Sequence, residues 1–98
     1  MNRETRQLRE ELARQMGEMD YGELTPYLKR VVKIAPALDF LEAAQAICSD
    51  DTRRVERWAK EGLISRVSET DLREWHRRRP RFLAVVTAPW VLVQERLD

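Results

Sequence analysis

The spacing of apolar residues predicts an amphipathic helix at the start of the chain. In residues 3–18, Leu8, Leu12 and Met16 recur every four positions among charged, helix-favouring residues. We expect this helix to end near Gly17 and to pack its narrow apolar stripe against the rest of the protein.

The next segment favours a short helix followed by a strand. Thr25 and Pro26 are typical of a helix N-cap and of the first helical residue, and this helix would carry Leu24 and Leu28 toward the core. Residues 31–35 form a β-branched run closed by a proline, which predicts a strand.

A pair of short helices is predicted next. Asp39 and Glu42 have the spacing of a capping box, in which the Asp39 carboxylate accepts from the Glu42 amide and the Glu42 side chain reaches back. Cap-type residues at 49–52 start the second helix, and Gly62 ends it. The residues expected to face inward from the two helices are Phe40, Leu41, Ala44, Ile47, Cys48, Val55, Trp58 and Ala59.

The rest of the chain predicts another helix and the central strands. Residues 63–67 favour a short strand, and Ser68 with Asp71 three residues later predicts a helix start. Residues 82–94 are uncharged and rich in β-branched side chains, with one bend at the Ala-Pro pair at 88–89. We expect them to supply the central strands.

These elements predict the α+β class, with four to five helices packed on a small, mostly antiparallel sheet. The 98 residues suffice for one domain, with an N-terminal amphipathic helix over residues 1–18 and an α+β core over residues 31–95. At this length folding buries roughly 60 to 68% of the surface that the unfolded chain exposes, so the core is small.

Composition favours a small globular protein, since 43% of the residues are hydrophobic and 36% are charged. No apolar run approaches the roughly 20 residues of a membrane span, and the polar N-terminus does not resemble a signal peptide. The single Cys48 cannot form an internal disulfide. We therefore predict a cytoplasmic protein without a membrane partner.

Charge is distributed unevenly although the net charge is only +1. Residues 1–52 carry a net charge of −3, and residues 53–98 carry +4. Clustered arginines suit phosphate or an acidic protein surface, but they also suit a solvated face that keeps a small domain soluble. The candidate anion-binding or nucleic-acid-binding residues are Arg53, Arg54, Arg57, Arg77, Arg78, Arg79 and Arg81.

The sequence contains no recognisable catalytic, cofactor-binding or metal-binding motif. One cysteine, Cys48, and one histidine, His76, do not make a zinc site. The three glycines are isolated, which excludes a phosphate-binding loop or a dinucleotide fingerprint. Asp50 and Asp51 stand where helix amides favour negative side chains. We therefore expect no catalytic residue, no cofactor and no metal, and a protein that is not an enzyme.

Three segments, LDFLEAAQAICSDD, VERWAKEGLISRVS and above all VVTAPWVLVQE, resemble a family of small bacterial proteins catalogued as a domain of unknown function. The resemblance covers roughly residues 8–95, and its most specific part is the APWVLVQ string from Ala88 to Gln94. It implies no activity. The family usually has a tryptophan near Tyr21 and no proline at Pro26, so this chain departs from it there.

Glu42-Ala43-Ala44 and the segment from Val55 to Gly62 are similar to the helix-turn-helix of excisionase-like and MerR-like DNA-binding domains. The turn is about one residue longer than in those domains and lacks their usual glycine, and the wing is short. Asp50 and Asp51 would also lie at the end of the recognition helix that approaches DNA, where phosphates would repel them.

Two functions therefore remain open. The first is a non-enzymatic interaction module that forms a homodimer or binds an unknown protein partner, and the alternative is a nucleic-acid-binding domain that uses the arginines. If residues 82–94 lay at a sheet edge, they would lack the charges that usually protect such edges, and a second copy would cover them. If they are central strands, Trp90 lies in the core instead. The candidate interface residues are Pro89, Trp90 and Leu92.

Overall fold

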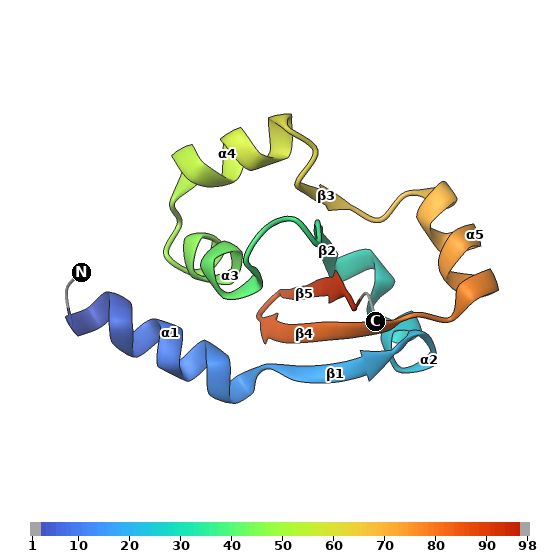
Figure 1. The fold of residues 1–98 in the computed structure, drawn as a ribbon, viewed down its shortest axis with the longest axis horizontal. Helices are drawn as coiled ribbons and strands as arrows, with labels where there is room; N and C mark the ends of the chain where they lie inside the picture. The colour runs from blue at the N-terminus through green and yellow to red at the C-terminus, as the bar shows by residue number, and fades with distance from the viewer. Residues whose placement is uncertain (1–2, 97–98) are drawn as a thin grey trace.

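The computed structural model describes residues 3–96, which form a five-stranded sheet with helices against both faces (Figure 1). In chain order the elements are α1 (Arg3–Gln15), β1 (Gly17–Asp20), α2 (Tyr21–Leu24), the 3-10 helix η1 (Thr25–Arg30), β2 (Val31–Ile34), α3 (Phe40–Cys48), α4 (Thr52–Lys60), β3 (Ile64–Arg66), α5 (Glu69–Arg78), β4 (Arg81–Thr87) and β5 (Trp90–Glu95). The predicted α+β class is confirmed.

The sheet has the strand order β1-β4-β5-β2-β3. Strands β2 and β5 pair in parallel, and the other three pairs are antiparallel, as expected for a mostly antiparallel sheet. Strands β4 and β5 form a hairpin in which Thr87 lies opposite Trp90, so the predicted bend at Ala88-Pro89 is a full turn with a cis peptide bond. Both strands are inside the sheet, which confirms that residues 82–94 supply central strands. The sheet edges are β1 and β3.

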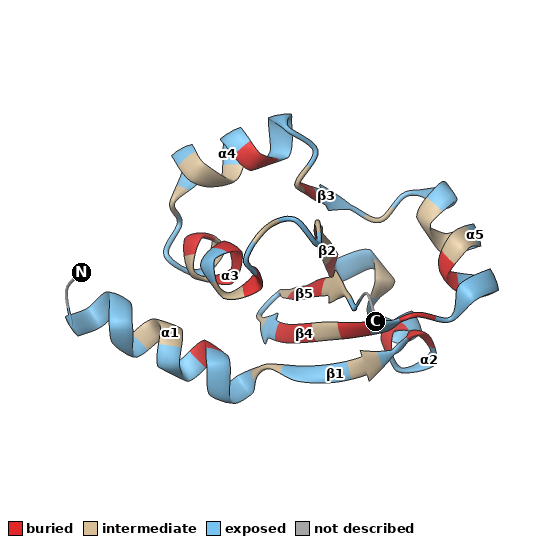
Figure 2. Cartoon of the chain, viewed as in Figure 1, coloured by how far each residue is buried: buried red, intermediate tan, exposed pale blue. Residues whose placement is uncertain are grey.

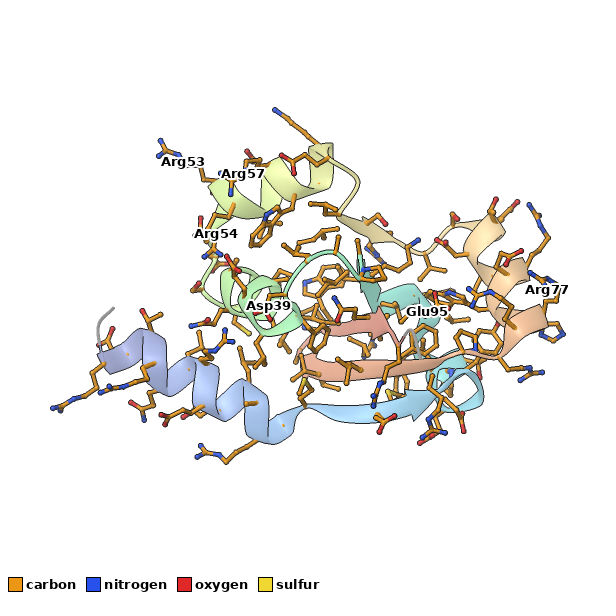
Figure 3. The ribbon with its side chains drawn as sticks, in the orientation of Figure 1. Asp39, Arg53, Arg54, Arg57, Arg77 and Glu95 are labelled. Carbon is orange, nitrogen blue, oxygen red and sulfur yellow. The ribbon has the colours of Figure 1, made fainter. Side chains whose placement is uncertain are left out.

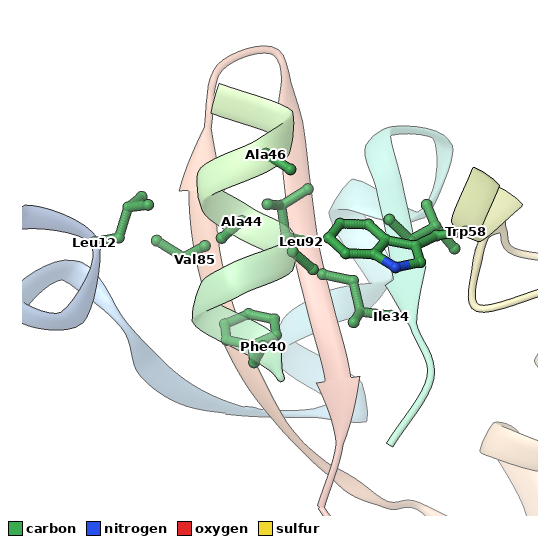
Figure 4. Packing of buried hydrophobic residues seen from close by; sticks show 10 residues of the cluster. Leu12, Ile34, Phe40, Ala44, Ala46, Trp58, Val85 and Leu92 are labelled. Carbon is green, nitrogen blue, oxygen red and sulfur yellow. The ribbon is translucent and has the colours of Figure 1, made fainter. Parts of the chain in front are cut away.

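One face of the sheet is covered by α1, α3 and α4. Figure 4 shows α3 lying along the β4–β5 hairpin, with its C-terminal end beside the hairpin turn. Ala43 and Ala44 of α3 are completely buried, and such small side chains let the helix approach the strands closely. The buried residues of this cluster are Leu12, Ile34, Phe40, Ala43, Ala44, Ala46, Trp58, Ile64, Val85 and Leu92.

The opposite face is covered by α2, η1 and α5. Trp75 of α5 fills its centre and packs edge-on against Tyr21 and Phe82, with ring centroids 6.4 and 4.8 Å away. The other buried members of this cluster are Leu24, Val31, Ala84, Val91 and Val93. Figure 2 shows that burial is concentrated in β4 and β5 and on the helix sides that face them. The hairpin is therefore the centre of both cores.

Most of the predicted helix ends are confirmed. The Asp39 carboxylate accepts from the Glu42 amide at 2.9 Å, although the Glu42 side chain pairs with Arg54 rather than reaching back. Ser68 and Asp71 form the predicted reciprocal capping box at the start of α5. Each of these two caps gives a hydrogen-bond acceptor to backbone amides that would otherwise lack a partner at the start of the helix.

The segment before β2 differs from the prediction. Thr25 is not an N-cap, because its hydroxyl donates back to the Gly22 carbonyl at 2.8 Å and closes α2. The cap is Asp20, which forms a capping box with Glu23, and Pro26 lies in the first turn of η1. Strand β1, which was not predicted, carries two charges and is held by its pairing with β4.

Two residues expected to face inward are exposed. The buried face of α3 includes Phe40, Ala43 and Ala44, so it is rotated about the helix axis relative to the predicted face. This rotation leaves Cys48 exposed. In α4 Trp58 is buried as expected, but Ala59 is exposed. The buried face differs because α3 packs on the hairpin with Ala43 and Ala44, whose small side chains allow a close approach.

Candidate functional site

The arginines predicted as an anion-binding cluster divide into two separate groups. Arg53, Arg54 and Arg57 lie on α4, whereas Arg77 lies on α5 at the other end of the molecule (Figure 3). The remaining three, within residues 78–81, follow Arg77 at that same end. The protein extends 43 Å along its longest axis, so the seven side chains do not form one surface.

Arg54 joins α3 to α4. Its guanidinium pairs with Glu42, lies 3.8 Å from Asp51 and stacks 4.8 Å from the centroid of the Trp58 ring. Arg53 and Arg57 form no ion pair within residues 3–96, so they are the members of the α4 group that are free to bind an anion.

At the other end, Arg77 and Arg78 both contact Glu74, at 2.8 and 3.2 Å, and Arg78 also pairs with Glu95. Hydrogen bonds from Arg77 and Arg78 lower the pKa of Glu74, and the one from Arg77 has the larger effect. Hydrogen bonds to Glu95 and Glu74 raise the pKa of Arg78, and the one to Glu95 has the larger effect. These arginines are therefore already engaged with carboxylates of the protein.

The last two arginines of the group also have partners. Arg79, in the left-handed conformation that ends α5, lies 5.3 Å from the centroid of the Tyr21 ring. Arg81 lies 3.4 Å from Glu18 of the neighbouring strand β1. Both residues remain exposed, and each has a contact within the protein.

A second charged cluster lies between α5 and the ends of β2 and β5, around a cavity of about 260 Å³. Lys33 and Asp71 meet there at 2.6 Å, with both side chains less than a third exposed. Burial raises the pKa of Asp71, but hydrogen bonds from Lys33 and Ser68 outweigh it, so the pKa lies below its usual value. Each of these charges has an opposite partner within the protein.

An apolar groove lies beside the β4–β5 turn. Among the residues that the structure describes, the exposed large hydrophobic side chains are Tyr27, which is 46% exposed, and Val86, which is 62% exposed. Both line this groove of about 360 Å³. We call it the hairpin groove, formed by Met19, Tyr27, Arg30, Val86, Ala88, Pro89 and Val91.

Val86 is exposed because of its position on the sheet. It follows the alternation of Phe82 and Ala84, so it points to the face covered by α2, η1 and α5. Phe82 and Ala84 are buried beneath that cover, whereas Val86, nearer the hairpin turn, is not. The groove therefore continues the apolar face of the sheet to the surface.

A larger cavity of about 590 Å³ lies on the other face of the same turn. We call it the helix-pair cavity, formed by Ala46, Ile47, Cys48, Asp50, Thr52, Val55, Glu56, Thr87, Ala88, Pro89 and Trp90. Ala88 and Pro89 line both this cavity and the hairpin groove. The turn thus separates two hollows on opposite faces of the sheet.

The two hollows carry opposite charges. The charged residue of the hairpin groove is Arg30, and those of the helix-pair cavity are Asp50 and Glu56. All three are exposed, and within residues 3–96 none of them forms an ion pair. They contrast with the paired charges of α5.

The candidate interface residues have different environments. Pro89 is exposed and Trp90 is half-buried, with the Arg66 guanidinium 4.8 Å from its ring centroid. Leu92 is completely buried under α3 and is not accessible to a partner. The accessible part of this segment is therefore the turn, together with the part of Trp90 that lines the helix-pair cavity.

Cys48 lies beside the hairpin turn, whereas His76 lies on α5. Partial burial raises the pKa of the Cys48 thiol, against a smaller lowering by a hydrogen bond with Thr87. His76 packs edge-on against Tyr21, with ring centroids 6.3 Å apart. Over the described range, no group of three His, Cys, Asp or Glu residues is placed to hold a metal ion, and no helix is long and apolar enough to cross a membrane.

Comparison with known proteins places this architecture in a family. A family described as proteins of unknown function, DUF2288, matches residues 7–95. The chain belongs to the DUF2288 family. Solved structures that resemble it include the NMR solution structure of PA1075 from Pseudomonas aeruginosa, with 34% sequence identity and a TM-score of 0.80 over 100% of this chain and 93% of that one. No curated protein matches at a significant level.

The family assignment confirms the resemblance seen in the sequence to a domain of unknown function. The exposed pair of this DUF2288 domain, Tyr27 and Val86, was not predicted from the sequence. Val86 stands inside an uninterrupted apolar run, and only the layout of the covering helices distinguishes it from its buried neighbours. Arg30 gave no signal either, because it lies outside the arginine clusters.

Proposed function

We propose that this DUF2288 protein is a non-enzymatic interaction module that associates with a second copy of itself through the hairpin groove. The observation that carries the proposal is the clustering of the exposed large hydrophobics. Tyr27 and Val86 line one groove together with Pro89. Contiguous exposed apolar surface of this kind is typical of protein-interaction sites.

A binding role is also consistent with the state of the polar groups. Lys33 and Asp71 are paired with each other, and Glu74 and Glu95 are paired with arginines. Such pairs connect elements of the fold, as Lys33 of β2 and Asp71 of α5 do. The polar clusters of the described residues thus stabilise the fold.

A second copy is the partner that best fits this end of the sheet. The surface around the turn is apolar at its centre and carries both signs of charge, with Arg30 on one face and Asp50 and Glu56 on the other. A surface that carries complementary features around one point can bind a copy of itself by a closed two-fold contact. Pro89, at the border of both hollows, would lie near the centre.

Light scattering on the purified protein tests the proposal. At tens of micromolar we expect a mass about twice the 11.6 kDa of the chain. Val86→Glu should give a folded monomer, because it places a charge in the apolar contact, whereas the side chain is exposed in the single copy. Tyr27→Gln, at another exposed position, should have the same effect.

Thr70→Glu is the matched control. It adds the same charge at an exposed position in the first turn of α5, where a carboxylate is well tolerated. This variant should remain a dimer. A monomeric natural protein, or a dimer that survives both Val86→Glu and Tyr27→Gln, would refute the proposal.

A further inference from the structure

We infer that the two copies meet end to end at their hairpin turns, with the two-fold axis in the plane of the sheet, so that Arg30 of each copy pairs with Asp50 and Glu56 of the other. This inference rests on the proposed self-association and adds to it the arrangement of the copies and the charged groups that hold them.

Side chains at the turn alternate between the two faces of the sheet. Val86 lies opposite Val91, and both point into the hairpin groove. Thr87 lies opposite Trp90, and both point into the helix-pair cavity on the other face. The groove and the cavity are thus back to back across the thickness of the sheet, and each carries its own sign of charge.

Two end-to-end arrangements with two-fold symmetry keep both sheets in one plane. If the axis is perpendicular to the sheet, each face stays on its own side, so groove meets groove and cavity meets cavity. Arg30 would then face the partner's Arg30. The carboxylates would likewise face the same carboxylates of the partner. If the axis lies in the sheet plane, across the strand ends, the rotation exchanges the faces and brings the groove of one copy against the cavity face of the other.

Charge selects the second arrangement. Like charges placed opposite each other in an interface are repulsive, whereas opposite charges attract and set the orientation. Arg30, Asp50 and Glu56 are free to make such contacts, because none of them forms an ion pair within residues 3–96. The nearby Arg54 is not a competitor for these carboxylates, since Glu42 and Asp51 already hold it.

The same arrangement gives the apolar residues a partner. With the faces exchanged, the α3–α4 corner of one copy approaches the hairpin groove of the other, and Ile47 and Val55 supply apolar surface in the cavity of that corner. Tyr27 and Val86 then lose contact with water while Arg30 reaches the rim. An apolar centre with a charged rim is the usual anatomy of a protein interface.

Charge reversal with mixing tests the arrangement. Arg30→Glu and Glu56→Arg, both at exposed positions, should each raise the dimer dissociation constant by about 5- to 10-fold, because each two-fold dimer contains the contact twice. An equimolar mixture of the two variants should form a heterodimer with nearly the natural affinity, since the two reversed charges then attract each other in one contact and the natural pair forms in the other. Sedimentation equilibrium measures all three constants.

Arg73→Glu and Glu61→Arg are the matched controls, because they make the same charge changes at exposed positions that line neither hollow. Both should dimerise as the natural protein does. If the natural protein dimerises but neither Arg30→Glu nor Glu56→Arg weakens it, this arrangement is wrong and the proposed self-association still stands. If the natural protein is a monomer, both are wrong.

Discussion

Asp71 performs two tasks with one carboxylate. It completes the capping box with Ser68 at the start of α5, and it accepts a hydrogen bond from Lys33 of β2. The first contact orders a helix end, and the second ties that helix to the sheet. One side chain thereby connects local structure to packing.

This double role predicts a pH dependence of stability. The pKa of Asp71 is lower in the folded protein than in the unfolded chain, so the carboxylate stabilises the fold above its unfolded pKa of about 4, and this contribution is lost as the pH falls through the folded pKa. Asp71→Asn should therefore reduce the unfolding free energy at pH 7, and the difference from the natural protein should shrink toward pH 3. Urea unfolding at a series of pH values measures it.

Glu69→Gln provides the control for this series. Glu69 is an exposed carboxylate in the same helix and forms no ion pair within the described residues, so its removal should leave a small difference at every pH. A difference between Asp71→Asn and the natural protein that stays constant from pH 7 to pH 3 would contradict this role of Asp71.

The helix α1 shows how an element with little apolar surface is held in place. Its buried residue is Leu12, which is 3% exposed and lies in the cluster with Ala44 and Val85 (Figure 4). One hydrogen bond, from Gln45 of α3 to the Thr5 carbonyl at 2.8 Å, adds to this contact. Leu12 is therefore the fully buried contact of the helix, while Leu8 packs partly against the same cluster and Arg9 lies 3.6 Å from Asp39.

We expect Leu12→Ala to lower the unfolding free energy by about 2–5 kcal/mol, because it leaves a cavity under α3. Leu8→Ala should cost less, since Leu8 is only partly buried. Urea midpoints give the order, and hydrogen exchange should show α1 amides losing protection first in the Leu12 variant. If Leu8→Ala were the more damaging change, the helix would be docked through a different face.

Elements that follow from local rules could be predicted from the sequence. The caps at Asp39 and Ser68 and the left-handed Gly62, with φ +76°, depend on neighbouring residues alone, and they mark α3, α4 and α5 within a few residues of their observed ends. The uncharged, β-branched segment of residues 82–94 likewise predicted the centre of the sheet.

Elements that depend on distant partners could not be predicted from the sequence. Strand β1 carries Glu18 and Asp20 and has no β-branched residue, so its sequence does not favour a strand. This segment forms a strand because β4 supplies backbone hydrogen-bond partners, with Glu18 opposite Leu83. The accessibility of Val86 has the same origin, since it depends on where the covering helices stop.

Across the whole molecule, the charges around α5 and those around the hairpin turn differ in their partners. Arg77 and Arg78 at one end are paired with carboxylates, whereas Arg30, Asp50 and Glu56 at the hairpin turn form no ion pair within residues 3–96. The turn end is also where the exposed hydrophobics gather. Unpaired charges beside exposed apolar surface are the reason for proposing this end as the binding surface.

The most direct test of self-association through the hairpin groove is an isotope-filtered NMR experiment on a mixture of ¹³C-labelled and unlabelled protein. We predict intermolecular cross peaks from the Val86 methyl groups to protons of the unlabelled copy, because Val86 lines the groove and is 62% exposed in the single copy. The half-buried Leu63, which lines a hollow remote from the turn, should give none. Intermolecular peaks from Leu63 without any from Val86, or no intermolecular peak at all, would contradict the account.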